Sequence, residues 1–129
     1  MTITEHITDL ATRVRQAGAD SPLVYVALRV AAQAWLQVDR AGADELRWGV
    51  AGTAVQDATD LLFPQPPATA VTIDAELLAD EQECRVAIRQ LLLQVAAVLH
   101  DGAQGGGNPR AWQYASAALT LRRAADDLT

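Results

Sequence analysis

The sequence contains no lysine, a single cysteine and few aromatic residues. One cysteine cannot form a disulfide within the chain, and such cysteine usage is typical of a reducing compartment. The sequence has no run of about 18 apolar residues, so it predicts no membrane-spanning helix. Residues 1–15 include Glu5 and Asp9 and lack the apolar segment of a secretory signal peptide. We therefore expect a cytoplasmic protein with no membrane partner.

Positive charge is also scarce and scattered. The formal net charge is −6 at pH 7, and all ten cationic residues are arginines. Apart from the pair Arg122–Arg123, these arginines are separated along the chain. Nucleic-acid-binding domains normally carry a basic patch or stripe. We therefore expect no nucleic-acid partner.

What the sequence does contain is apolar residues that favour helices. Half of the residues are hydrophobic, and most of these are alanine, leucine or valine; alanine and leucine are strong helix formers. A chain of 129 residues fits one domain, which we assign to residues 1–129. The predicted fold is all-α: an antiparallel bundle of four to five helices with a proline-rich crossover between helices three and four.

Five helical segments can be placed from apolar periodicity and capping residues. The first repeats apolar residues at Ile3, Ile7, Leu10 and Val14. The second begins at Ser21–Pro22, a good cap followed by a favoured first-turn proline, and its apolar character predicts a central position. The expected ranges are 2–17, 22–41, 45–62, 72–101 and 109–127, with the prolines of 63–71 as the crossover and Gly102 as the end of the fourth helix.

Gly49 and Gly52 lie three residues apart inside the third predicted helix. Each costs about 1 kcal/mol of helix stability relative to alanine. Two interpretations are favoured: the glycines allow another backbone to approach closely, or they lie on the outer face of the helix with Thr53 and Gln56. A role in contacting a ligand is the less expected alternative.

No catalytic, metal-binding or cofactor-binding residues are predicted. The two histidines, His6 and His100, lack the Glu-x-x-His spacing of di-metal bundles. Cys84 lies on an apolar stripe and is expected to be a buried, inert thiol. The glycine-rich segment 102–107 is expected to be a loop between helices, because neither a preceding strand nor the lysine of a phosphate-binding loop is present.

The large aromatic residues are the candidate lining of an apolar ligand pocket: Trp35, Trp48, Trp112 and Tyr114. The favoured alternative is that they are the bulky members of an alanine-rich core. Exposed tryptophan surface would instead indicate a protein partner.

The fourth predicted helix is the candidate interface. At roughly 28 residues it would span about 42 Å and outrun its neighbours, so part of its apolar stripe would need a cover. The residues concerned are Leu77, Leu78, Cys84 and Ile88. A symmetric homodimer is a common way to bury such a surface. A helix break between Asp80 and Glu83, or cover from the crossover, would explain the stripe equally well.

The functional hypothesis is a non-catalytic helical protein-interaction module that self-associates as a homodimer or binds another protein. The alternative is a bundle that binds a small molecule or effector in an aromatic-lined pocket. Enzymatic activity is the least expected class, because no recognised catalytic arrangement occurs in the sequence.

The charge distribution gives the first testable prediction. The protein should show no appreciable binding to DNA or RNA at physiological salt, because it has few positive charges with which to neutralise phosphates. A gel-shift titration checks this. Salt-sensitive binding at micromolar concentration would contradict it.

Overall fold

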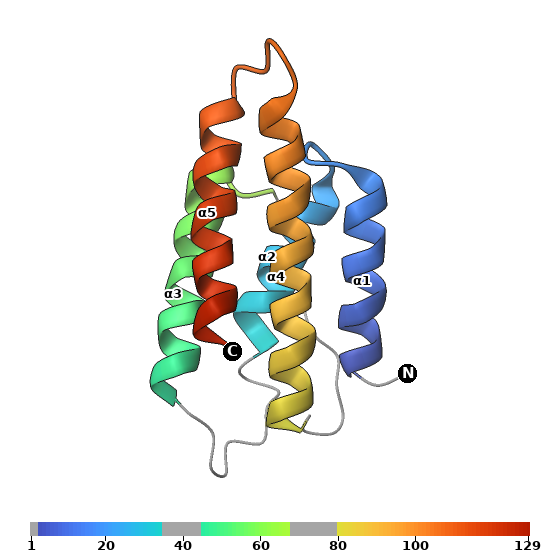
Figure 1. Cartoon of the computed structure of the whole chain (residues 1–129), viewed down its shortest axis with the longest axis vertical. Coiled ribbons are helices and arrows are strands. Elements are labelled where there is room, and N and C mark those ends of the chain that lie inside the picture. The colour runs from blue at the N-terminus through green and yellow to red at the C-terminus, as the bar shows by residue number, and fades with distance from the viewer. Residues whose placement is uncertain (1–2, 35–44, 68–79) are drawn as a thin grey trace.

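The computed structural model describes residues 3–34, 45–67 and 80–129. Within these residues the chain forms the helices α1 (Ile3–Ala17), α2 (Pro22–Gln33), α3 (Glu45–Leu62), α4 (Glu81–Gln104) and α5 (Ala111–Asp127). The helices pack side by side as a bundle (Figure 1). The predicted all-α fold is therefore confirmed. Trp35, Leu77 and Leu78 lie outside the described residues.

The direction of each helix follows from Figure 1. Helices α1, α3 and α4 run one way, and α2 and α5 run the other way. The consecutive helices α3 and α4 are therefore parallel, which departs from a fully antiparallel bundle. Helix α5 packs against both α3 and α4 in the antiparallel sense.

Helix α4 has the most extensive buried face of the described helices. It packs against α1, α2 and α5, and nine of its residues are buried, including Leu91, Leu92, Val95 and Leu99. The sequence placed the second helix at the centre. Over its 12 described residues α2 buries five and contacts α1, α3 and α4, so both α2 and α4 lie against three other helices.

The apolar stripe of α1 and the start of α2 were predicted correctly from periodicity and local chemistry. In α1 the predicted stripe Ile3, Ile7, Leu10 and Val14 is buried. At the start of α2 the Ser21 hydroxyl oxygen accepts a hydrogen bond from the Leu23 backbone N–H at 3.1 Å, and Pro22 occupies the first helical position. This bond satisfies one of the amide groups that a helix leaves unpaired at its N-terminus.

The start of α4 differs from the expected Thr72. Asp80 is the N-cap, and its carboxylate accepts a hydrogen bond from the Glu83 backbone N–H at 3.0 Å. An aspartate that caps a helix has a non-helical backbone, so α4 begins at Glu81. The helix is therefore not continuous through Asp80, and the expected start at Thr72 lies outside the described residues.

The end of α4 also differs from the prediction, because Gly102 lies inside the helix. A Cβ atom added to Gly102 would lie 2.8 Å from the Ala19 Cβ and 3.1 Å from Tyr114 Cδ2. Gly102 is therefore the point where α4 meets both the α1–α2 loop and α5. Close packing, rather than helix termination, explains this glycine.

Helix α5 begins later than the Asn108–Pro109 start expected from the sequence. The Asn108 side-chain oxygen accepts from the Arg110 backbone N–H at 2.8 Å in a turn before the helix. The Arg110 guanidinium donates to the carbonyl of Leu62 at the C-terminus of α3 and lies over the Tyr114 ring, 5.3 Å from its centroid. A cation suits this helix end because the carbonyl groups there carry partial negative charge. Arg110 thus ties α3 to α5.

The N-cap of α4 gives a prediction whose sign depends on where the helix begins. Asp80→Ala should lower the free energy of unfolding by about 1 kcal/mol, because the Glu83 amide loses its acceptor. Asp80→Asn should retain most of the stability. The matched control is Gln82→Ala, an exposed position two residues further along the chain. Urea denaturation checks this. If α4 continued unbroken from Thr72, alanine at position 80 would instead increase stability.

Candidate functional site

The structure does not gather the candidate aromatic residues into one pocket. Trp48 is buried on α3 and Tyr114 is buried on α5, and they border different depressions of the surface. Trp112 is 66% exposed. Trp35 lies outside the described residues. Trp48 and Tyr114 therefore follow the alternative of core aromatics, whereas Trp112 presents the exposed tryptophan surface that would indicate a partner.

The candidate interface on α4 needs correction at two of its four residues. Cys84 and Ile88 are buried in the core of the single chain, because α4 is covered by α1, α2 and α5. They have almost no surface to offer a second molecule. A substitution such as Ile88→Asp would act on folding and would not report on an interface.

Cys84 is also unsuited to nucleophilic chemistry. Burial first, and then the negative charge of nearby Glu81, raise the pKa of the Cys84 thiol to about 11. The thiolate is the reactive form, so the thiol is protonated and inert at neutral pH. The expectation of a buried thiol agrees with this placement.

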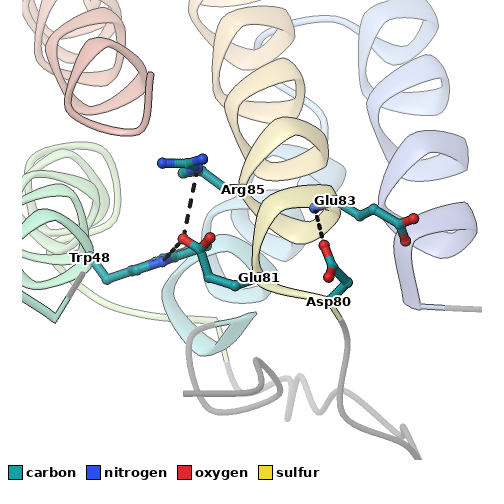
Figure 2. A network of polar contacts seen from close by, with 5 residues as sticks. All are labelled: Trp48, Asp80, Glu81, Glu83 and Arg85. Carbon is teal, nitrogen blue, oxygen red and sulfur yellow. Dashed lines mark hydrogen bonds and ion pairs between the residues drawn. The ribbon is translucent and has the colours of Figure 1, made fainter. Parts of the chain in front are cut away.

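A polar network connects α3 with the first turn of α4, as Figure 2 shows. The Trp48 indole N–H donates to Glu81 Oε1 at 3.0 Å. The Arg85 Nε atom lies 3.7 Å from the same oxygen. Glu81 is the first residue of α4 because Asp80 caps the helix, so this cap sets the position of the carboxylate that orients Trp48.

Beside Trp48, a groove runs between α2 and α3. Its volume is about 340 Å³. Ala31 and Ala32 form the α2 wall, Gly49 and Gly52 belong to the α3 wall, and Ile88 of α4 is among the apolar residues beneath them. The space between the walls stays unfilled because all four of these wall residues are small. The pair of glycines is the sequence feature that marks this groove, although their spacing alone does not predict one.

The structure decides between the two main interpretations of these glycines. A Cβ atom added at Gly49 or at Gly52 would have no neighbour within 4 Å. No other part of the described chain therefore approaches these positions closely. They lie on the open side of α3, where Gly49 and Thr53 are exposed.

Large apolar side chains are exposed on α3 and α5, and sequence reasoning missed them as a group. They are Leu46 (77%), Val50 (47%), Trp112 (66%) and Leu119 (50%). Leu46 and Val50 are four residues apart, and Trp112 and Leu119 are seven apart, so each pair shares one face of its helix. The available signal was that Trp112 and Leu119 do not fall on the stripe of Tyr114, Ala118 and Leu121, which recur at steps of four and three residues.

The described residues hold no group of three or more His, Cys, Asp or Glu side chains placed to bind a metal ion. Within those same ranges, every helix is too short or too polar to cross a membrane. Compared with protein-family models, with curated proteins and with solved structures, the chain matches none of them. The arguments for function therefore come from the groove and from the exposed apolar faces.

Glycine substitutions test this description, because the same change should act in opposite directions at different positions. Gly52→Ala should raise the free energy of unfolding by about 0.5–1 kcal/mol, because it removes the conformational cost of glycine and meets open space. Gly102→Ala should lower it by about 1–3 kcal/mol, because the new methyl group overlaps Ala19 and Tyr114. Thermal and urea unfolding measure both. Destabilisation by Gly52→Ala would show that the groove wall is misplaced.

Proposed function

We propose that this protein is a non-catalytic helical interaction module that associates with a second copy of itself through the exposed apolar residues of α3 and α5. The observation that carries the proposal is the exposure of Trp112. Tryptophan is enriched at protein interfaces and among the residues that contribute most to binding energy. This surface replaces the α4 interface expected from the sequence.

On α5, the exposed face continues over three helical turns. Trp112, Ser116, Leu119 and Arg123 recur at steps of four, three and four residues, and all four are exposed. Such spacing places them in one stripe. A tryptophan and a leucine separated by a small serine form a ridge that a facing helix can pack against.

Helix α3 contributes a similar stripe beside it. Leu46, Val50, Thr53 and Asp57 have the same spacing and are all exposed. Helices α3 and α5 are antiparallel neighbours (Figure 1), so the two stripes run along adjacent helices. Exposed apolar side chains that recur along a helix are typical of an interaction site, and a two-fold dimer buries the same surface on both copies.

The proposal predicts a concentration-dependent dimer. Leu119→Asp should shift the protein to monomer, because it places a charge without a partner at the centre of the α5 stripe. Val86→Asp is the matched control: Val86 is 54% exposed on α4, outside the proposed surface, and its replacement should leave the dimer intact. Light scattering after size exclusion measures the molecular mass of each.

Two results would overturn the proposal. One is a wild-type protein that remains monomeric at high micromolar concentration. The other is a dimer that dissociates with Val86→Asp and survives Leu119→Asp, which would move the contact to α4. Circular dichroism on each variant ensures that the folded proteins are compared.

A further inference from the structure

We infer that the groove between α2 and α3 is a binding site for a small, uncharged, largely apolar molecule that lies against Trp48. The site differs from the self-association surface in most of its residues, although Thr53 belongs to both. It also differs from the aromatic pocket expected from the sequence, because Trp48 alone of the described candidate aromatics borders it.

The size of the groove suits a small molecule. Its volume of about 340 Å³ lies at the lower end of the range of roughly 300–1,000 Å³ that is typical of ligand sites. Leu92 of α4 and Leu128, just beyond α5, are among the buried residues that form its apolar lining. These side chains belong to the main core, so the base of the groove is held rigidly by the packing of the bundle.

The polar side chains of the lining are already engaged within the protein. The Thr53 hydroxyl donates to the Gly49 carbonyl at 2.9 Å. The Gln56 amide accepts from Arg29 at 3.3 Å and donates to Asp60 at 2.9 Å. A polar ligand would have to compete with these bonds, whereas an apolar ligand leaves them intact.

The Trp48 indole N–H is likewise directed away, toward Glu81 (Figure 2). Trp48 therefore offers the groove its apolar ring surface. None of the described residues of the lining is charged, so an ion that entered the groove and lost its water would gain no ionic partner from them, which costs several kcal/mol. The lining thus selects for neutral molecules.

The two glycines provide an independent reason to regard the groove as functional. Each lowers the stability of α3 by about 1 kcal/mol relative to alanine, and within the described residues no close contact at Gly49 or Gly52 compensates for this cost. Residues that lower stability and whose presence packing does not explain are expected at functional sites. Glycine at these positions keeps the α3 wall low and the groove open.

Fluorescence titration of the full chain with N-phenylnaphthylamine tests the inference. This neutral aromatic probe gains emission in apolar surroundings. Wild type and Gly52→Ala should bind it, since one methyl group leaves most of the groove open. Gly52→Leu, which fills the groove from α3, and Ala32→Leu, which fills it from α2, should each weaken binding by about tenfold or more.

The sulfonated analogue, anilinonaphthalene sulfonate, tests the class of ligand. It should bind wild type about tenfold or more weakly than the neutral probe, because none of the described residues of the lining is charged and Arg29 beside them is already bonded to Gln56. Equal or tighter binding of the sulfonate would overturn the inference. So would unchanged binding of the neutral probe to folded Gly52→Leu and Ala32→Leu.

Light scattering on Gly52→Leu separates this site from self-association. The variant should have the same molecular mass as wild type at each concentration. A groove-filling substitution that converts a dimer to a monomer would show that the groove is covered by a second copy, and would overturn the small-molecule site. A monomeric wild type that still binds the probe would overturn the proposed self-association alone.

Discussion

Burial of the apolar face of α4 is the constraint on which the rest of the structure depends. Leu91, Leu92, Val95 and Leu99 are fully buried, and water can be excluded from them only if helices lie on several sides of α4 at once. Helices α1, α2 and α5 provide this cover, and α3 joins through its contacts with α5 and α2. The hydrophobic effect is the main favourable term in folding, so this requirement sets the arrangement of the bundle.

Covering α4 uses many small residues, which determines where the surface is hollow. Ala27, Ala31, Ala51 and Ala58 are buried and let neighbouring helices approach closely. The same small side chains cannot fill the space where α2 and α3 diverge. There the glycines of α3 and the alanines of α2 leave a groove, and buried residues of α4 form its base. The groove is thus a local consequence of packing a bundle with small residues.

The helix features that depend on neighbouring residues could be predicted from the sequence, whereas the packing of helices against one another could not. The stripe of α1 and the Ser21–Pro22 start of α2 follow from periodicity and capping, which involve residues within one or two turns. The start of α4 was misjudged because an aspartate in an acidic helical pattern is ambiguous until its carboxylate is seen to bond Glu83. The burial of Ile88 within a single chain, and the separation of Trp48 from Tyr114, depend on how helices pack against one another, which we could not predict from a single sequence.

Two glycines show most clearly why the candidate site could not be predicted from the sequence alone. Gly52 and Gly102 both lie inside helices in the structure, where glycine has the same intrinsic cost relative to alanine. In the folded protein Gly102 is required because Ala19 and Tyr114 leave no room for a methyl group, whereas Gly52 faces open space. The first cost is offset by packing against two other parts of the chain. The cost of Gly52 is not offset by any contact within the described protein. A molecule that enters the groove would supply the missing contacts.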